Sequence, residues 1–264
     1  MSRPCHVLRV FTRGSDGGNR LGVVNDVVGV SDDDMQAVAA DLGFSETVFV
    51  DWCDPALDPS VRIFTPRSEL PFAGHPLVGT AWTLSVLGPG ASGVIATAVG
   101  PARYSIEGDM VWIESAIHIG DEGADLAAVV AGVAGLPPPM ASRSLTLPKV
   151  YHLCEYPTFE DVAALEPAME ALEDQFGLYA FAVDGHEVKA RFFSPSSGVP
   201  EDPATGSAAV ALAEEFRMRG EIEGAVTVLQ GDEMGAPSTI HLRWDALATS
   251  IGGTVVQDEV VQVL

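Results

Sequence analysis

Cysteine is scarce in this chain: only Cys5, Cys53 and Cys154 occur, and they lie far apart. Their spacing matches no metal-binding pattern. An odd, sparse set of cysteines also suits a reducing compartment better than a disulfide framework. We therefore expect a cytoplasmic protein with no structural disulfide and no metal held by thiolates.

Positive charge is scarce as well. The chain has 14 Lys and Arg against 37 Asp and Glu, a net charge of −23 and a pI near 4.3. A nucleic-acid-binding protein normally presents a basic patch, so we exclude nucleic acid as a partner. We attribute the negative charge to solubility, with a cationic substrate as the alternative interpretation.

Long apolar runs are also missing. No stretch reaches the ~18 apolar residues that a membrane-spanning helix needs. The first five residues also lack the basic-then-apolar order of a signal peptide, so we expect no membrane partner. Hydrophobic residues nevertheless make up 47% of the 264 positions. This content supports a core large enough for two modest lobes or one large domain.

Two segments of the chain look like copies of one unit. In the first, residues 62–66 (RIFTP) precede residues 72–76 (FAGHP) and an apolar run. In the second, residues 191–195 (RFFSP) precede residues 202–208 (DPATGSA) and another apolar run. Each pattern predicts a strand, a proline-bounded loop and a glycine turn that opens a helix. The period is about half the chain, which indicates duplication, so we expect two related halves with a site between them.

The duplication aligns Gly74 with Gly206 and His75 with Ser207 at the starts of the two helices. A helix N-terminus offers unpaired N–H groups and a positive dipole end, which suit a carboxylate or an enolate. The alternative is that the two glycines only permit tight turns. Their repetition favours a functional role.

Three ionisable side chains stand near these motifs. His75 at a helix start would have its pKa lowered by the helix dipole and act as a neutral acid–base group, or it would only cap the helix. Asp202 precedes the second helix and would also serve as a cap. Glu46 lies between a glycine-terminated helix and an apolar strand, where burial would raise its pKa as a general acid–base group requires. The alternative is an exposed glutamate at a strand start.

The hydrophobic pattern predicts the elements around these motifs. Helices are expected over residues 32–42 (capped by Ser31 and closed by Gly43), 76–87, 126–136, 159–176 (broken near Pro167) and 208–219. Strands are expected over residues 7–12, 21–24, 47–50, 61–65, 148–154, 178–183, 188–193, 240–244 and 254–264, with further strands between 95 and 119. Pro76 is expected at the first position of its helix, where the N–H that proline lacks has no partner in any case.

Five segments closely resemble, in order, motifs of the phenazine-biosynthesis PhzF-like family: residues 18–19 (GN), 44–47 (FSET), 69–76 (ELPFAGHP), 201–208 (EDPATGSA) and 235–238 (GAPS). The match spans nearly the whole chain, and the two long motifs are highly specific. The resemblance implies an α+β protein with the diaminopimelate-epimerase fold. In that fold, two similar lobes each wrap a curved, mostly antiparallel sheet around a central helix, and the active site lies in the cleft between them.

The resemblance also implies boundaries and roles. One lobe would comprise residues 1–115, with the last strand, 254–264, returning to it, and the other residues 116–253. Glu46, His75 and Asp202 match the family's catalytic residues. We expect Glu46 to be the main proton shuttle, with its pKa raised by burial and by Asp202. The substrate-binding positions are Asn19, Ser45, Ala73, Gly74, Thr205, Gly206 and Ser207. The resemblance further implies no metal or organic cofactor, a small-molecule carboxylate substrate and a homodimer.

The chain also departs from its relatives. Epimerases and proline racemases of this fold use two cysteines at the helix starts, where this chain has Ala73 and Thr205. The PhzF-like family often has proline after its early asparagine and arginine before its late proline, where this chain has Arg20 and Ala236. A two-thiol mechanism is therefore not expected, and the phenazine substrate itself is not inherited.

Three functions remain open from the sequence. The first is a cofactor-free isomerase that moves a proton within a small carboxylate-bearing metabolite by general acid–base catalysis. The second is an epimerase or racemase that uses carboxyl and imidazole groups in place of thiols. The third is a non-catalytic protein that binds a small acid. The third is the weakest, because Glu46, His75 and Asp202 are all present.

Overall fold

The computed structural model describes residues 2–52, 58–88, 90–115, 125–147, 149–175 and 177–264. The chain folds into two compact units. Unit 1 comprises residues 1–116 and 251–264, and unit 2 comprises residues 117–250. Cys53 and most of the expected boundary region, residues 116–124, lie outside the described residues. Within those residues, no helix is both long and apolar enough to cross a membrane.

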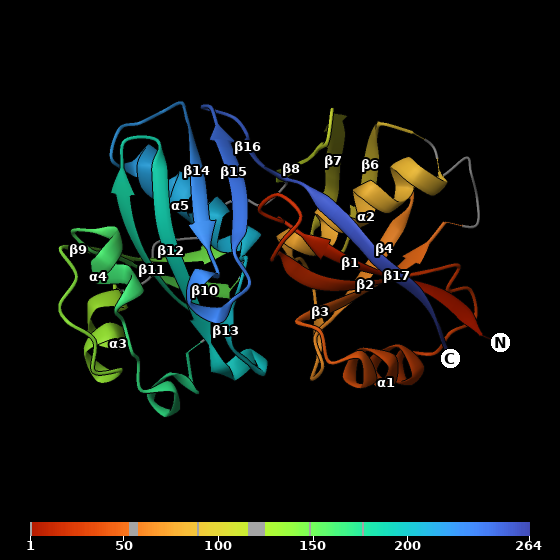
Figure 1. Cartoon of the computed structure of the whole chain (residues 1–264), viewed down its shortest axis with the longest axis horizontal. Helices are drawn as coiled ribbons and strands as arrows, with labels where there is room; N and C mark the ends of the chain where they lie inside the picture. The colour runs from red at the N-terminus through yellow and green to blue at the C-terminus, as the bar shows by residue number, and fades with distance from the viewer. Residues whose placement is uncertain (1, 53–57, 89, 116–124, 148, 176) are drawn as a thin grey trace. The chain divides into compact units, whose positions relative to one another are not determined.

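Unit 1 is a mostly antiparallel sheet around one buried helix (Figure 1). Its elements are β1 (Arg3–Val10), β2 (Asn19–Asn25), α1 (Asp32–Leu42), β3 (Glu46–Asp51), β4 (Ser60–Phe64), β5 (Glu69–Leu70), α2 (Gly74–Leu87), β6 (Ser92–Thr97), β7 (Gly100–Glu107), β8 (Met110–Ser115) and β17 (Val255–Val263). Helix α2 packs on seven of these strands, β1 to β3, β6 to β8 and β17. It is apolar nearly all round, which is the composition of a helix enclosed by its own unit.

Helix α1 covers the other face of the unit 1 sheet. Ser31 caps its N-terminus by accepting from the Asp34 N–H, and Gly43 ends it in the left-handed conformation, both as the sequence predicts. Its apolar side packs with Cys5, Val24 and Phe49. Gly22 faces Leu42 and Cys5 on this side, whereas Leu21 faces Gly79 of α2 on the other. The sheet is therefore buried on both faces.

Unit 2 repeats this plan (Figure 1). Its elements are α3 (Ala127–Val133), β9 (Ala141–Leu147), β10 (Lys149–Glu155), α4 (Phe159–Ala163), β11 (Gly177–Asp184), β12 (Glu187–Ser194), β13 (Val199–Asp202), α5 (Gly206–Met218), β14 (Gly224–Gln230) and β15 (Ser238–Trp244). Strand β16 (Thr249–Gly253) spans the boundary with unit 1. Helix α5 packs on β9, β10 and β15, and α3 and α4 pack against a separate cluster that includes Cys154 and Phe193.

The duplication extends to strand pairing. In unit 1, β1/β2 is antiparallel, β2/β3 parallel, β3/β4 and β4/β5 antiparallel, β4/β6 parallel and β6/β7 antiparallel. In unit 2, the pairs β9/β10, β10/β11, β11/β12, β12/β13, β12/β14 and β14/β15 follow the same sequence of directions. Helices α2 and α5 begin at Gly74 and Gly206, the two glycines that the sequence aligns.

Each unit also contains the same trio of side chains, which are Arg62, Phe64 and Glu69 in unit 1 and Arg191, Phe193 and Glu201 in unit 2. The arginine donates from Nε and Nη2 to the two carboxylate oxygens, at 2.7 and 2.7 Å in unit 1 and at 2.8 and 2.9 Å in unit 2. Its Cζ lies 5.1 Å and 4.8 Å, respectively, from the centre of the phenylalanine ring. The trio ties the short strand before each central helix to the main sheet.

Several expected elements differ in detail. The helix expected over 159–176 is reduced to α4 and a 3-10 turn at Met169–Leu172, because Pro167 disfavours helical backbone just before it. Asp202, expected in a loop, ends strand β13. Pro76 is the third residue of α2, still within the turn whose N–H groups have no helical partner. Strands β5, β9, β13, β14 and β16 were not expected.

Candidate active site

Glu46 and His75 meet within unit 1. Glu46 is the first residue of β3, and His75 is the second residue of α2. Their side chains are 16% and 4% exposed, and Glu46 Oε2 lies 3.4 Å from His75 Nε2. This distance is longer than that of a well-formed hydrogen bond, and a small movement would bring the carboxyl and the imidazole within hydrogen-bonding distance.

Burial lowers the pKa of His75 to about 3, and a hydrogen bond with the backbone of Arg20 opposes this shift only in part. The imidazole is therefore neutral near neutral pH. It carries one donor and one acceptor nitrogen and places no positive charge beside Glu46. The sequence predicted a neutral histidine from the helix dipole, whereas in the structure the main cause is burial.

Asn19 and Ser45 hold the other side of the imidazole. Ser45 Oγ donates to Asn19 Oδ1 at 2.8 Å, and this bond turns the amide nitrogen of Asn19 toward His75 Nδ1, at 3.4 Å. Asn19 is buried at the start of β2, and Ser45 directly precedes β3. The structure thus brings together four residues that the sequence named: Asn19, Ser45, Glu46 and His75.

The N-termini of α2 and α5 share a feature that α1 and α4 lack. Ser31 and Thr158 cap α1 and α4 with side-chain hydrogen bonds. Ala73 and Thr205, at the starts of α2 and α5, make no side-chain capping bond, and neither does Leu126 at the start of the short helix α3. No side-chain cap therefore occupies the first N–H groups of the two central helices, which is compatible with the binding of a carboxylate there.

In unit 2, Asp202 and Thr205 are linked. Thr205 Oγ1 donates to Asp202 Oδ2 at 2.6 Å, across the turn between β13 and α5. The amide of Gln230, at the end of β14, bonds to both residues. The sequence missed Gln230, because its strand was not expected and its contacts are set by strand register.

Ser207, the second residue of α5, accepts a hydrogen bond from Tyr151 at 2.7 Å. Tyr151 lies on β10 and is buried. Because the tyrosine hydroxyl donates, the Ser207 hydroxyl proton can point toward another acceptor. Tyr151 is a second residue that the sequence did not identify, since nothing near it in the chain marks it.

The duplication shows which groups are specific to each unit. The registers of β2 with β3 and of β10 with β11 place Gly177 at the position of Glu46. A Cβ on Gly177 would lie 2.3 Å from the Phe192 ring, so no side chain fits there. Ser207 takes the position of His75. The described part of unit 2 therefore has no copy of the Glu46–His75 pair.

The described cysteines are unsuited to acid–base catalysis. Burial raises the pKa values of Cys5 and Cys154 to about 12, so both remain protonated thiols. Neither lies at a helix start, where Ala73 and Thr205 stand instead. Nor do the described residues bring three or more His, Cys, Asp or Glu side chains together as metal ligands.

The two departures from the resembled family have local roles. The guanidinium of Arg20 is stacked over the Phe44 ring, with its Cζ 4.3 Å from the ring centre. The Ala236 N–H donates to the Gly231 carbonyl and closes the turn after β14. Arg20 therefore lies in β2 directly after Asn19, and Ala236 lies in the turn that follows Gln230.

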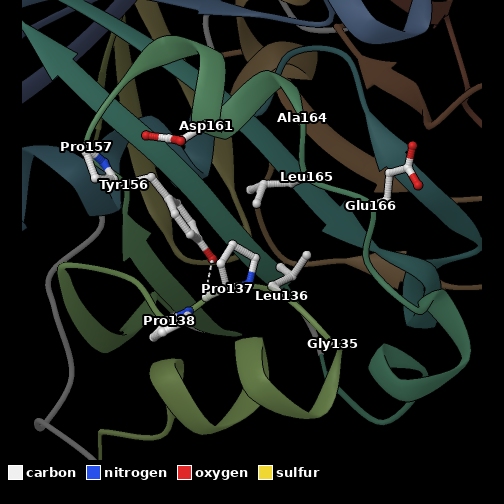
Figure 2. Close-up of a pocket in the computed structure, with 10 residues that line it drawn as sticks. All are labelled: Gly135, Leu136, Pro137, Pro138, Tyr156, Pro157, Asp161, Ala164, Leu165 and Glu166. Atoms are coloured by element: carbon white, nitrogen blue, oxygen red, sulfur yellow. Dashed lines mark hydrogen bonds between the residues drawn. The ribbon is translucent and has the colours of Figure 1, made fainter.

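Unit 2 also has a cavity of about 470 Å³ that contains none of the candidate residues (Figure 2). It is lined by Gly135, Leu136, Pro137, Pro138, Tyr156, Pro157, Asp161, Ala164, Leu165 and Glu166. The Tyr156 hydroxyl donates to the Pro137 carbonyl at 3.2 Å, and Asp161 is engaged in the capping of α4 (Figure 2). The polar groups of Tyr156 and Asp161 therefore serve the local fold.

Known proteins match this chain along its length. The PhzC-PhzF family, described as phenazine biosynthesis-like protein, matches residues 8–119 and 156–259. A trans-2,3-dihydro-3-hydroxyanthranilate isomerase of Pseudomonas chlororaphis is 31% identical over 256 residues, which cover 93% of this chain and 91% of the relative.

Solved structures agree on the fold. A PhzF-family protein of Enterococcus faecalis covers 100% of both chains with a TM-score of 0.81 and 19% identity. A hydroxyproline epimerase of Agrobacterium vitis covers 99% of this chain and 92% of its own, with a TM-score of 0.66 and 12% identity. The expected α+β fold is thus confirmed. The chain belongs to the phenazine biosynthesis-like PhzC-PhzF family and, like its curated relatives, is an isomerase.

Proposed function

We propose that the protein is a cofactor-independent isomerase that moves one proton within a small carboxylate-bearing metabolite. The observation that carries this proposal is the asymmetry of the duplicated units. The Glu46–His75 pair occurs in unit 1, and unit 2 has Gly177 and Ser207 at the same positions. A single acid–base pair suits the removal and return of one proton better than a racemase mechanism with one base from each half.

Glu46 is the proposed proton shuttle. Such a group must both accept and donate a proton near neutral pH. A protonated imidazole 3.4 Å away would hold Glu46 as a carboxylate, whereas the neutral His75 ring does not. Asn19 and Ser45 fix the imidazole, so it also offers a hydrogen bond to the substrate or to the Glu46 carboxyl.

The remaining groups are assigned to substrate binding. The N–H groups at Gly74, Gly206 and Ser207 would hold a carboxylate and the negative charge that develops when a proton leaves carbon. Asp202 would accept from a donor group of the substrate. The substrate of the Pseudomonas relative is, by its name, an anthranilate and so carries a carboxylate, which supports this class of ligand.

An exchange experiment in heavy water distinguishes the proposed isomerisation from epimerisation. The purified protein is incubated in it with a panel of carboxylate metabolites, including trans-2,3-dihydro-3-hydroxyanthranilate, and products are examined by mass spectrometry and chiral chromatography. An isomerase gives a constitutional isomer in which a proton or deuteron sits on a different atom. Label on the original carbon with inverted configuration would instead establish an epimerase, and binding without exchange or product would support a non-catalytic protein.

A further inference from the structure

Gln230 is fully buried at the end of β14, and both its amide nitrogen and its amide oxygen make hydrogen bonds. Its Nε2 donates to the Asp202 carbonyl at 2.7 Å and to Thr205 Oγ1 at 3.0 Å. Its Oε1 accepts from the Thr205 N–H at 3.4 Å. One amide is therefore bonded to Asp202 and to Thr205, at the two ends of the turn that joins β13 to α5.

These bonds have a fixed direction. The Asp202 carbonyl can only accept, so the nitrogen of the Gln230 amide must face it. That nitrogen also gives its second proton to the Thr205 hydroxyl oxygen. The Thr205 hydroxyl is then left to donate its own proton to Asp202 Oδ2, at 2.6 Å. Gln230, Thr205 and the Asp202 carboxylate form a chain in which each group orients the next.

Unit 1 shows that the fold does not require this chain. The registers of β4 with β6 and of β12 with β14 place Thr97 at the position of Gln230. The aligned turn has Leu70 and Ala73 where unit 2 has Asp202 and Thr205. Helix α2 nevertheless opens at Gly74 just as α5 opens at Gly206. The polar chain is therefore an addition of unit 2 to a turn that forms without it.

The end of β14 is held firmly. Gly231 has φ +83, and a Cβ there would lie 2.8 Å from the Pro203 carbonyl, so the two turns touch through their backbones. Buried Lys189 donates to Asp232 Oδ2 at 2.7 Å and lies 2.8 Å from Glu233 Oε1. These contacts fix the strand end from which the Gln230 side chain extends.

We infer that Gln230 is a positioning residue, which acts through Thr205 Oγ1 to hold the Asp202 carboxylate ionised and in one orientation. The catalytic meaning of this role rests on the proposed isomerase function, but the role itself does not depend on a substrate.

The direct test is the titration of Asp202 by NMR. The protein is labelled with carbon-13 at the Asp carboxyl carbons, and the Asp202 signal is assigned with Asp202→Asn. In Gln230→Met, which has similar volume but no donor, the midpoint of the Asp202 titration should move to higher pH. Thr205→Val, which removes the relay and leaves Gln230 in place, should move it in the same direction.

Gln175→Met is the matched control, because it makes the same substitution in unit 2 at a glutamine that bonds to His152. It should leave the Asp202 titration unchanged. Superimposable Asp202 titrations in wild type, Gln230→Met and Thr205→Val would overturn the inference. An equal shift in Gln175→Met would overturn it too, since the effect would then be a general loss of stability.

The kinetic arm uses a substrate found in the heavy-water screen. Gln230→Met should lower kcat/KM about tenfold, the effect of one lost hydrogen bond of typical strength, and should raise the pH of the acidic limb of the rate profile. Thr205→Val should lower kcat/KM by a smaller factor in the Gln230→Met background than in the wild type, because both changes break the same chain of hydrogen bonds. If the two substitutions lower kcat/KM independently, the inference that Gln230 acts through Thr205 is overturned. If no substrate turns over, the isomerase proposal fails while the NMR result still decides the role of Gln230.

Discussion

At the scale of single residues, Glu46 carries the proposed chemistry. Glu46→Gln preserves shape but removes the group that titrates. General acid–base catalysis typically contributes about 10²–10⁴-fold in rate, so turnover should fall by at least that lower value while ligand affinity changes little. Steady-state kinetics and calorimetric titration would measure the two effects. Glu259→Gln, at an exposed position in β17, is the control, and near-normal turnover in Glu46→Gln would make His75 the better candidate.

His75 provides a test through pH-dependent stability. Burial lowers its pKa from 6.5 to about 3 in the folded protein. As the pH falls below 6.5, the unfolded chain binds a proton at this residue and the folded chain does not, so stability is lost between 6.5 and about 3. The loss should approach about 1.4 kcal/mol per pH unit for this one group. Urea unfolding of wild type and His75→Asn at several pH values should show a shallower decline in the variant; parallel declines would contradict the assignment.

The candidate residues that the sequence names lie in local motifs. Glu46, His75, Asp202 and Ser207 sit within three short segments, residues 44–47, 69–76 and 201–208, that are visible in the chain. Gln230 and Tyr151 contact Thr205 and Ser207 from β14 and β10, so their contacts depend on how distant strands pair. Strand register is a property of the folded sheet, and no local pattern near these two residues records it.

At the scale of elements, the two arginine trios allow the same Arg→Lys substitution to be compared at a buried position and at a partly exposed one. Arg191 is buried and also donates to the carbonyls of Ala163 and Leu165, whereas the side chain of Arg62 is 36% exposed. Lysine keeps the charge but loses the paired geometry and the stacking. Arg191→Lys should therefore destabilise the protein by about 1–3 kcal/mol, and Arg62→Lys by less than about 1 kcal/mol.

Urea unfolding measures both variants, with circular dichroism to confirm that each is folded. Equal losses of unfolding free energy would show that the difference in burial does not determine how much each trio contributes to stability. A larger loss in Arg62→Lys would indicate that the ion pair of Arg62 with Asp32 matters more than its exposure suggests.

The central helices were the elements most securely predicted. Helix α2 is apolar on nearly every side, α5 carries an unbroken apolar run over residues 208–213, and both open at a glycine turn that the sequence shows. The region 159–176 failed this test, since Pro167 interrupts it and only α4, with the capping box of Thr158 and Asp161, remains helical. Strand β13 was missed because four residues before a helix look like a loop until they pair with β12.

At the scale of the whole molecule, the two units share a backbone plan and differ in the polar side chains near their central helices. The repeated segments in the sequence indicated two copies, and the same order of strand pairing in both units confirms a shared plan. The copies differ at the residues to which the proposed reaction is assigned: unit 1 has a carboxyl–imidazole pair, and unit 2 has an Asp–Thr–Gln chain. The alignment of Gly74 with Gly206 located these positions, but it did not show which contacts each copy had kept.

Net charge bears on the proposed homodimer. Each chain has a charge of −23, so two copies repel one another at low ionic strength. Salt shortens the range of this repulsion, from a Debye length of about 30 Å at about 0.01 M to about 8 Å at about 0.15 M. We therefore expect sedimentation equilibrium to show a dimer of the 27.7 kDa chain whose dissociation constant falls as salt is added. A single 27.7 kDa species at every salt concentration would reject the dimer. An affinity that weakens with salt would instead indicate an interface held by opposite charges.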